Sequence, residues 1–472
     1  MLHLPKTAKG PIFLPVETTV RELDAKLLVA AEAVAKGYAV IVGAKSETLN
    51  IAERVGCGIW LDKGHGDHYI DARLSRLRRS NVCCTALDEE GFLYASDEAY
   101  FTNSGIKTGA ALKYLDSIFV WGTHQKKTLE TFSFAREKLT LTGNPRFDLY
   151  HARFRSMFSE KIRYLENKYQ TYILINTNFA PGNYAYFYKK PFLENLQDSG
   201  AIKNGEDYEF FKGWSEYAKV LFERYSEMVV MLAKELPHVN LIIRPHPSEE
   251  HTTWIDSVKG CSNICVNRDG NVIDWIFGAK AVIHTGCTTG VEAFVGGVPV
   301  LRYHPVYDSR YESALSNSLG DSAGDHESLL AKAKKIVAGD FNNANHHSSE
   351  LEHYLCNFNE ANLAYENIVN EFDRLSGSGS TQGLISHNLF NSLSASFVCN
   401  AKTKIRFIRN VLKSIDFRET DRVRKFDDLK VDDVSKKVGL IMAILEDKKG
   451  DEVSRKYVSK QLGEKAIGIF PV

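Results

Sequence analysis

Two motifs in the second half of the sequence contain residue types that could hold a phosphate. The first, Arg244-Pro245-His246-Pro247, directly follows the apolar residues 240–243, and we expect residues 240–244 (NLIIR) to form a strand. A proline on each side of His246 restricts the backbone and keeps the imidazole out of a helix. His246 could donate to a phosphate, and Arg244 could add a charge-assisted bond worth about 1.5–3 kcal/mol. The alternative is a turn with a solvated histidine.

The second motif, residues 284–290 (HTGCTTG), lies between an apolar run and a predicted helix. Helix N-termini attract anions because aligned peptide dipoles place about half a positive charge there. Glu292, in the first turn, could accept hydrogen bonds from ribose hydroxyls. N-capping by one threonine would explain one hydroxyl but not the whole run. Together the motifs predict a nucleotide site, with candidate ligands Arg244, His246, Pro247, Thr285, Gly286, Thr288, Thr289, Gly290 and Glu292.

A cluster of carboxylates in the first half is the other candidate for chemistry. Asp88-Glu89-Glu90 follows residues 82–87 (VCCTAL), and Glu17 ends the first apolar run. Carboxyl ends of parallel strands meet at one edge of a sheet, so we expect Glu17 and this cluster to lie there together. Mutual repulsion and partial burial could raise the pKa of at least one of them. The alternatives are a helix-capping acid at Glu17 and a solvated acidic loop at residues 88–90.

Other polar residues could line the cleft that contains these groups. Asn144 and Arg146 lie in a Gly-Asn-Pro-Arg turn, where Arg146 could meet a sugar carboxylate or a phosphate, or form a structural salt bridge. Asn176 and Asn178 end another apolar run. Lys63 lies in a polar loop with His65 and His68 that could touch donor or acceptor, or be merely solvated. Aromatic residues between 208 and 225 have helical spacing, which favours a core role over acceptor binding.

These residues need a scaffold of alternating strands and helices, and the apolar pattern predicts one. The expected strands are residues 11–16, 38–42, 58–61, 82–87, 117–121, 139–142, 172–176, 240–244, 281–284 and 299–302. The expected helices are residues 20–36, 47–55, 73–79, 156–169, 208–236, 272–277, 289–295 and 348–375. Continuous apolar strands between helices indicate parallel sheets covered on both faces. Ligands of such sheets bind beyond the carboxyl ends of the strands.

The length of 472 residues exceeds one ordinary core and predicts two α/β domains with extras. We expect an N-terminal Rossmann-like domain at residues 1–165, which carries the catalytic carboxylates. A second, nucleotide-binding domain is expected at residues 166–375, with its closing helix. A Gly/Ser linker at 376–385 and a small helical appendage at 386–472 would follow, the latter with helical periodicity at 405–415.

Residues 240–302 resemble the donor-binding half of GT-B glycosyltransferases. The resemblance lies in Gly290 to Ala293 and in Gly297-Val298-Pro299-Val300, together with the His-Pro motif and the downstream hydroxyl pair. The last two features are similar to those of transferases that use CMP- or CDP-activated donors. The resemblance implies a GT-B fold, in which two doubly wound Rossmann-like domains face a cleft.

A wider set of motifs resembles the retaining β-Kdo transferases that build bacterial lipopolysaccharide and capsule. The set comprises Glu17 with residues 21–24 (RELD), then residues 87–92 (LDEEGF), 142–148 (TGNPRFD), 176–179 (NTNF) and 244–247 (RPHP). This resemblance implies that CMP-Kdo is the donor, that a glycan on a lipid carrier is the acceptor, and that no metal or other cofactor takes part. It also implies double displacement with Asp88 as nucleophile and Glu17 as acid and base. Capsule enzymes show Glu-Asp-Gly-Phe where this chain has Glu89-Glu90-Gly91-Phe92, so Glu90 could be the nucleophile instead.

Two other functions remain open from the sequence. One is a non-hydrolysing UDP-sugar 2-epimerase, because residues 299–302 (PVLR) are similar to a motif of those enzymes. The other is a catalytically silent scaffold of polysaccharide assembly.

Composition and charge narrow the partners. Lys plus Arg and Asp plus Glu number 59 each, so the chain has no global attraction to nucleic acid. Eight scattered cysteines do not complete a zinc site and fit a reducing compartment. No apolar run approaches the length of about 20 residues that a membrane span needs, and residues 1–10 do not resemble a signal peptide. We therefore expect a cytoplasmic protein, with peripheral association at the inner membrane through basic residues 402–413.

Overall fold

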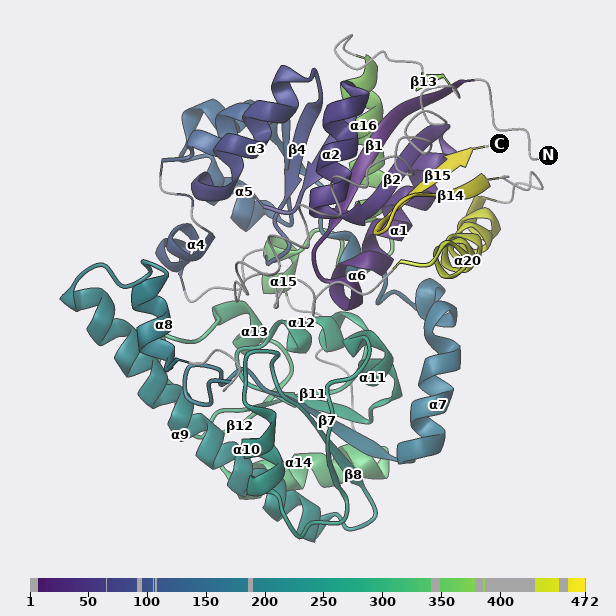
Figure 1. Ribbon diagram of the computed structural model, residues 1–472. Helices are drawn as coiled ribbons and strands as arrows, with labels where there is room; N and C mark the ends of the chain where they lie inside the picture. Colours follow the sequence, from purple (N-terminus) through teal and green to yellow (C-terminus); the bar gives the residue numbers. More distant parts are fainter. Residues whose placement is uncertain are drawn as a thin grey trace. The chain divides into compact units, whose positions relative to one another are not determined.

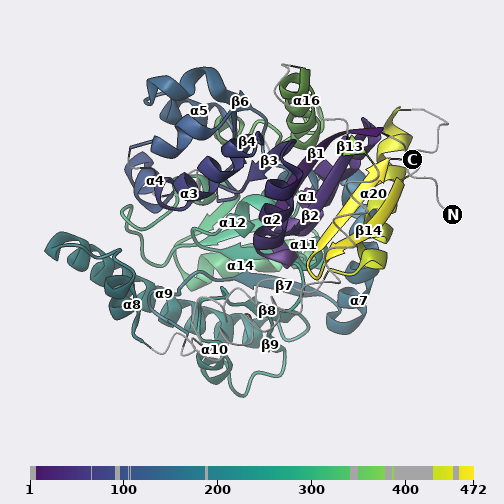
Figure 2. The same cartoon turned by 45° about the horizontal axis from the view of Figure 1, so that its top comes forward.

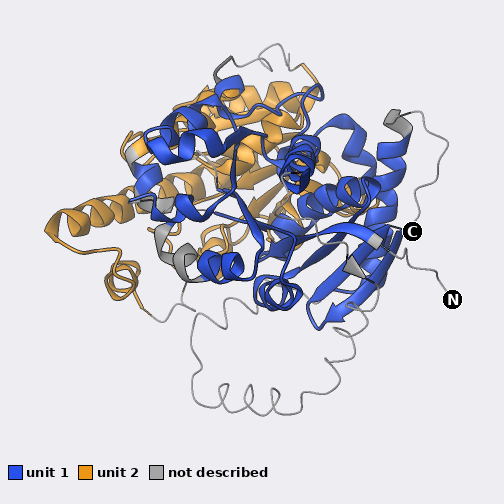
Figure 3. Ribbon diagram, turned by 90° about the horizontal axis from the view of Figure 1, so that it is seen from above, with its two compact units in different colours: residues 1–92, 98–157, 352–472 blue, residues 93–97, 158–351 orange. Residues whose placement is uncertain are grey.

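The computed structural model describes residues 7–64, 66–90, 96–104, 106, 108–185, 190–340, 349–377, 385–386, 429–449 and 457–471. The chain divides into two compact units (Figure 3). The first unit comprises residues 1–92, 98–157 and 352–472, and the second comprises residues 93–97 and 158–351. Each unit contains its own sheet, and each is described by itself below.

The sheet of the first unit has a parallel centre. Its strands are β1 (Thr7–Val16), β2 (Tyr38–Ala44), β3 (Ile59–Asp62), β4 (Cys83–Leu87), β5 (Ser117–Val120) and β6 (Leu139–Leu141), all parallel in the order β2-β1-β3-β4-β5-β6. These strands match the predicted apolar runs, and almost all residues of β2, β3, β4 and β5 and residues 11–16 of β1 are buried. Short β13 (Ile385–Ser386) pairs with β1.

The helices of the first unit lie in the connections between these strands or come from residues after β6. They are α1 (Thr19–Ala35), α2 (Lys45–Val55), α3 (Asp67–Arg79), α4 (Asp97–Ser104), α5 (Thr123–Leu129), α6 (Pro145–Asp148), α15 (Ser349–Tyr354), α16 (Ala364–Gly377) and α20 (Val431–Lys449). Helix α1 is buried over most of its circumference and packs against β2, α16 and α20 (Figure 1). The short 3-10 helices η1 (Ala110–Tyr114), η2 (Ser133–Lys138) and η3 (Ala152–Phe158) complete the connections.

The C-terminal part corrects the expectation of a purely helical appendage at residues 386–472. Helix α20 is followed by β14 (Tyr457–Gly463) and β15 (Ala466–Pro471), and β15 pairs antiparallel with β2 (Figure 2). Gly43 permits this approach, because a Cβ there would overlap the backbone of Lys465 and Ala466. The expected helix at 405–415 and most of the expected linker lie outside the described residues.

The segment before α16 corrects a second expectation, a single helix at residues 348–375. Helices α15 and α16 are separate because the chain between them turns inward at Asn357, which is fully buried. The Asn357 amide bonds to the backbone N–H and C=O of Asn144 and to Asp148 Oδ1, at 3.1, 2.9 and 2.6 Å. Asp148 also accepts from Ala364 and Tyr365 at the start of α16. These contacts place α16 in the first unit rather than with residues 166–351.

The second unit contains a six-stranded sheet among the described residues. Its strands are β7 (Tyr172–Asn176), β8 (Asn240–Arg244), β9 (Ile264–Val266), β10 (Ala281–His284), β11 (Val300–Tyr303) and β12 (Asp321–Ala323), all parallel in the order β12-β11-β10-β7-β8-β9. Its helices are α7 (Ser159–Tyr169), α8 (Phe192–Asp198), α9 (Gly205–Glu235), α10 (His251–Ser257), α11 (Val272–Gly278), α12 (Thr288–Val295), α13 (Ala314–Ser318) and α14 (His326–Ala338).

The register of the second sheet separates a dry face from a polar row. Ile173, Ile243, Ile283 and Leu301 point into the core that α9 and α14 cover. On the opposite face, Asn176 pairs with Arg244 and His284 pairs with Arg302. Because β10 pairs with β7 in the same register, these four polar residues form one row across the carboxyl ends of β11, β10, β7 and β8.

Both sheets have a topological switch point, where the strand order reverses. In the first sheet the chain runs outward in opposite directions from β1 and β3, and in the second from β7 and β10. Connections to the two sides cross on opposite faces of such a sheet, and ligands bind at the carboxyl ends of the two strands between them. This rule points to the residues after β1 and β3, and to those after β7 and β10.

Asn357→Ala should lower the free energy of unfolding of the first unit by about 2–4 kcal/mol, because buried groups of Asn144 and Asp148 lose their partners. Denaturant unfolding would measure this loss. Asn359→Ala, an exposed turn residue in the same segment, is the matched control. Equal stability of the two variants would contradict this account of the junction.

Candidate functional site

An alternating set of charges lies at the carboxyl edge of the first sheet. Lys45 and Lys63, which follow β2 and β3, contact the two carboxylate oxygens of Glu17 at 2.8 and 2.9 Å. Lys45 also lies 3.5 Å from Asp62, and Arg73 binds the other oxygen of Asp62 at 2.7 Å. Acids and bases therefore alternate along the ends of three neighbouring strands, on both sides of the switch point.

Helix α1 extends this set toward the acidic cluster. Glu22 accepts from the backbone N–H of Glu17 at 2.8 Å and from Lys63 at 3.1 Å. One turn later, Lys26 forms a buried ion pair with Glu89 at 2.8 Å, with side chains 2% and 8% exposed. Residues four apart lie on one face of a helix, so α1 aims both charges at the strand ends. Glu17 and the acidic residues 88–90, which were predicted to lie together, are therefore connected through contacts with Glu22 and Lys26 of α1.

The three acids 88–90 differ in burial. Glu90, with a side chain 53% exposed, is held by two bonds to Arg21 at 2.9 and 3.0 Å. Asp88 is 7% exposed; its carboxylate accepts from the Glu90 N–H at 3.0 Å, and its carbonyl accepts from the Trp121 indole at 2.7 Å. An incoming substrate can reach Glu90 more readily than Asp88 or Glu89.

The pKa values of three carboxylates move downward, opposite to the rise expected from mutual repulsion. Burial opposes ionisation of Glu17, but Lys45 and Lys63 bring its pKa to about 2. At exposed Glu90 the charges of Arg21 and Arg146 bring the pKa to about 2. At Glu89 burial is again overcome, and Lys26 is the main cause of the lowered pKa. These groups are ionised at neutral pH, which suits a nucleophile or a charge stabiliser. The predicted role of Glu17 as an acid needs a proton that a carboxylate with a pKa of about 2 does not hold at neutral pH.

Two predicted cleft residues of the first unit are buried. Arg146, 5% exposed, lies over the rings of Trp121 and Phe147, and its charge helps to lower the pKa of Glu89 and Glu90. Asn144 caps α6 by accepting from the Arg146 N–H at 2.9 Å and is wholly buried. Arg146 therefore belongs electrostatically to the acidic cluster, whereas the contacts of Asn144 are structural. His65, Gly91 and Phe92 lie outside the described residues, as does the side chain of His68.

In the second unit, the polar row contains donors that lack a partner among the described residues. These are Nδ2 of Asn176 and Nε of Arg302, and neither ring nitrogen of His284 has a described partner. Burial, with the charges of His304 and Arg302, lowers the pKa of His284 to about 3, so its ring is neutral. Arg244 differs, since its guanidinium donates to the carbonyls of Asp269 and Gly270 at 2.8 and 3.1 Å.

The His246 loop has a defined geometry. The backbone N–H of Ser248 donates to His246 Nδ1 at 3.2 Å, so a neutral His246 carries its proton on Nε2. His246 and Pro247 are exposed, as is Asn178 beyond β7. The loop is anchored by Glu249, which is 1% exposed and was absent from the predicted site. Burial raises the pKa of Glu249, although four hydrogen bonds oppose the rise.

The glycine–threonine loop is held by a second buried carboxylate. Glu312 accepts from the Thr285 hydroxyl at 3.3 Å, from Tyr217 at 2.6 Å and from Asn317 at 2.6 Å. The N–H of Gly286, a residue with φ of 55°, donates to the side-chain oxygen Oδ1 of Asn317 at 2.9 Å. Thr285 and Gly286 therefore bond to the protein, and their role as nucleotide ligands stays a prediction.

The remaining predicted ligands lie on α12. Thr288 and Thr289 are partly exposed at its N-terminus, whereas Glu292 is 3% exposed within it. Gly290 faces the His284 ring so closely that a Cβ there would overlap the imidazole. The ring of His284, at the end of β10, therefore packs directly against the backbone of Gly290 in α12.

Neither buried carboxylate could be found from its own position in the sequence. Glu249 stands beside Glu250 in a polar loop, and Glu312 stands between Tyr311 and Ser313. In the sequence both look like solvated acids in loops. Their burial becomes evident only from their hydrogen bonds to residues distant in the sequence, such as Thr177 and Tyr217. The nearest signal is that Glu249 follows the restrained Pro-His-Pro turn.

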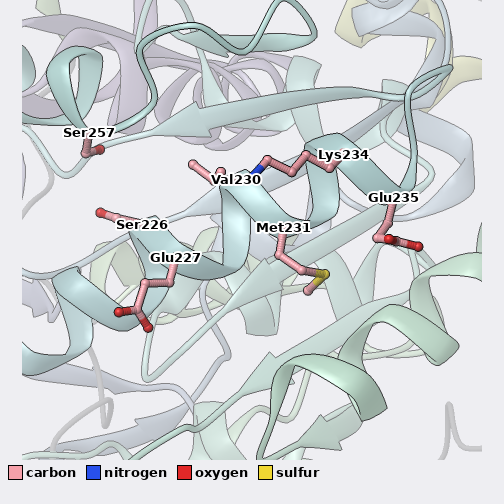
Figure 4. A pocket seen from close by; sticks show the side chains of 7 residues that line it. All are labelled: Ser226, Glu227, Val230, Met231, Lys234, Glu235 and Ser257. Carbon is pink, nitrogen blue, oxygen red and sulfur yellow. The ribbon is translucent and has the colours of Figure 1, made fainter.

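A groove of about 530 Å³ lies elsewhere on the second unit (Figure 4). Its lining comes from the last turns of α9 and from Ser257 of α10. Each of these helices leads into the start of a strand, so the groove lies toward the amino edge of the sheet. It contains none of the predicted site residues.

Among the described residues, no three His, Cys, Asp or Glu side chains gather in a way that could hold a metal ion. None of the described helices is both long and apolar enough to cross a bilayer.

The chain resembles solved structures although no protein-family profile and no curated protein matches it. The wall teichoic acid polymerase TagF, as a histidine-to-asparagine variant, has a TM-score of 0.51 at 10% identity, covering 78% of this chain and 89% of the polymerase chain. A UDP-N-acetylglucosamine 2-epimerase has a TM-score of 0.50 at 12% identity, covering 81% of this chain and 99% of the epimerase. The UDP-GlcNAc 2-epimerase of Neisseria meningitidis, bound to UDP-GlcNAc, has a TM-score of 0.45 at 11% identity, covering 77% and 99%. The likeness shows the fold: the protein is an α/β protein of the GT-B type.

Gly290→Ala should weaken nucleotide binding by about tenfold or more, because the new methyl group displaces α12 or the His284 ring. Alanine normally stabilises a helix by about 0.5–1 kcal/mol relative to glycine, so a loss must come from this contact. Isothermal titration with CMP and UDP would measure the affinity. Gly205→Ala, at an open position of α9, is the control. Unchanged affinity in Gly290→Ala would contradict the predicted site.

Glu17→Gln should destabilise the protein at neutral pH by about 1 kcal/mol, the upper range for solvent-screened pairs. The pKa of Glu17 is about 2 in the folded protein, below its ordinary 4.5, so the ion pairs stabilise the fold above pH 4.5. Their contribution disappears as the pH falls from 4.5 toward 2. Melting temperatures of variant and wild type should therefore differ clearly at neutral pH and converge as the pH falls toward 2.

Proposed function

We propose that this protein is a glycosyltransferase of bacterial surface polysaccharide, either lipopolysaccharide or capsule. Its donor is a nucleotide-activated acidic sugar, CMP-Kdo or a close relative, and it retains the anomeric configuration by double displacement. The observation that supports this proposal is that one chain with a GT-B fold carries both a carboxylate cluster and a set of hydrogen-bond donors at its two switch points. An ionised, lysine-supported carboxylate cluster lies at the switch point of one sheet, and unpartnered donors lie at that of the other, among the residues that the structure describes.

The second unit supplies the nucleotide half of the proposal. A nucleotide phosphate brings negative charge and acceptor oxygens to the carboxyl ends of β7 and β10. The amide of Asn176, the proton on His246 Nε2 and the N-terminus of α12 offer donors there. The cations nearest in the row, Arg244 and Arg302, add positive potential without needing to touch the ligand.

The first unit supplies the chemical half. In the proposed step a carboxylate oxygen attacks the anomeric carbon, and the bond to the CMP oxygen breaks with its electron pair leaving on the phosphate. The oxygen of an acceptor hydroxyl then attacks the same anomeric carbon and gives its proton to a base. The bond between that carbon and the enzyme oxygen breaks, and its electron pair stays on the released carboxylate. Glu90 is the nucleophile that access favours, because it is far more exposed than Asp88 or Glu89. Ionised Glu17 is the base.

The acceptor is a growing glycan, proposed to be lipid-linked, and the protein would meet it in the cytoplasm at the inner membrane surface. The basic residues 402–413, through which peripheral association was predicted, lie outside the described residues. The proposal needs no metal, because fixed cations and amides can stabilise the phosphate leaving group.

A UDP-sugar 2-epimerase is the second candidate, favoured by the likeness to the epimerase fold at a TM-score of 0.50. The predicted epimerase-like residues 299–302 lie at β11, beside β10. An epimerase converts a nucleotide sugar without an acceptor, whereas a transferase leaves it intact or hydrolyses it slowly. A silent scaffold would do neither.

A thermal-shift screen with CMP, CDP, UDP and GDP tests the donor class. We expect stabilisation by CMP, since bound ligand raises the melting temperature by mass action. A shift with UDP alone, or conversion of a UDP-sugar without acceptor, would exclude the Kdo proposal.

Incubation with CMP-Kdo under trapping conditions tests double displacement. It should leave a sugar adduct that mass spectrometry maps to Glu90, or to Asp88 or Glu89. Glu90→Gln should abolish the adduct, because an amide is a far weaker nucleophile than a carboxylate. Glu137→Gln, which changes an exposed acid of η2, should leave the adduct in place. An adduct that persists in Glu90→Gln would exclude Glu90 as the nucleophile.

A further inference from the structure

A single buried carboxylate joins the two loops at the carboxyl ends of β7 and β8. Glu249 Oε1 accepts from the Thr177 hydroxyl at 2.7 Å, from the His246 N–H at 3.0 Å and from the Phe179 N–H at 3.1 Å. Its other oxygen accepts from the Trp254 indole at 2.8 Å. Glu249 is only 1% exposed.

These contacts use the full capacity of the group. An ionised carboxylate offers about four lone-pair sites and no proton, and four donors face Glu249. Thr177 and Phe179 follow β7, one of the two switch-point strands, whereas His246 follows β8. The carboxylate therefore fixes the loop around exposed Asn178 relative to the imidazole.

Local backbone bonds complete the arrangement around His246. The Glu249 N–H donates to the His246 carbonyl at 2.8 Å, and the Ser248 N–H donates to the ring at Nδ1. One short turn thus fixes both the backbone of His246 and its tautomer. If residue 249 served only to fill space, an apolar side chain would cost less free energy to bury, because a buried carboxylate loses its hydration.

We propose that Glu249 is the positioning residue of the nucleotide site. It holds His246, with its proton on Nε2, and the loop 177–179 in the arrangement that receives a nucleotide phosphate. The residue acts through His246 and does not touch the ligand. This inference rests on the proposed binding of a nucleotide by the second unit. It identifies Glu249 as the residue that fixes the binding loops before the nucleotide arrives.

Glu249→Gln tests the proposal with nearly unchanged volume. An amide has one acceptor oxygen, so its NH₂ group must face either Trp254 or the three donors on the other side. We expect the His246 ring to lose its fixed tautomer and the affinity for CMP, or for whichever of CMP, CDP, UDP and GDP binds, to fall about tenfold. Glu250→Gln is the matched control, because Glu250 is the neighbouring acid and its carboxylate caps α10 through Thr252.

Two readouts separate this proposal from the proposed function. Nitrogen NMR of ¹⁵N-histidine-labelled protein, with the His246 signals assigned by His246→Gln, reports the tautomer and its titration without any ligand. Isothermal titration reports nucleotide affinity. If no nucleotide binds the wild type, the proposed function fails, and the NMR comparison still decides the role of Glu249.

Rescue by a second substitution distinguishes positioning from general stability. Trp254→Phe removes the indole donor, so in that background the amide introduced by Glu249→Gln can keep its oxygen toward Thr177, Phe179 and His246. The double variant should recover most of the His246 tautomer signal and of the affinity.

A second variant covers the case in which Glu249→Gln does not fold. Thr177→Val removes one donor to the carboxylate and should weaken binding about threefold. A folded Glu249→Gln protein with unchanged His246 signals, or with affinity within about twofold of wild type, would overturn the proposal, as would unchanged affinity in Thr177→Val if only that variant folds.

Discussion

A charge removed from water must meet an opposite charge or a set of hydrogen-bond donors, and the two sheet edges of this protein meet that requirement in different ways. The first edge balances acids against bases, as in the chain from Arg73 through Asp62 and Lys45 to Glu17. The second edge surrounds isolated carboxylates with neutral donors, as at Glu249 and Glu312. The first solution keeps its carboxylates ionised, and Glu90 is the most exposed of residues 88–90. The second ties up its carboxylates beneath the loops and leaves neutral donors such as the Asn176 amide for an anionic ligand.

Strands that consist of a continuous apolar run could be predicted closely from the sequence, because the signal lies within the strand itself. The apolar runs at residues 172–176, 240–244 and 281–284 became strands with the same bounds. The edge strands β9 and β12 were not predicted, because each has only three residues and neither is fully buried. The hairpin of β14 and β15 was not predicted either, since β15 pairs with β2, more than 400 residues earlier.

The candidate site shows the same division between local and distant causes. Motif position suggested that Glu17 and residues 88–90 lie at one edge of the sheet, but it did not indicate that the pKa values of Glu17, Glu89 and Glu90 are lowered. The cations responsible, Lys26 and Lys45, begin or lie within helices, where a lysine is ordinarily taken as a solvated surface residue. Asn144 shows the converse source of error, because a polar residue in a conspicuous turn is explained by Asn357, which lies 213 positions away.

The pairing of β15 with β2 also bears on the order in which the chain acquires its structure during translation. Residues 158–351 are contiguous, so most of the second unit can fold as soon as they leave the ribosome. The first unit must wait with β2 lacking its neighbour until residues 466–471 have been made. An unpaired edge strand of buried apolar residues is prone to association with other chains. Until then the backbone N–H and C=O groups on that edge of β2 can pair with strands of other chains.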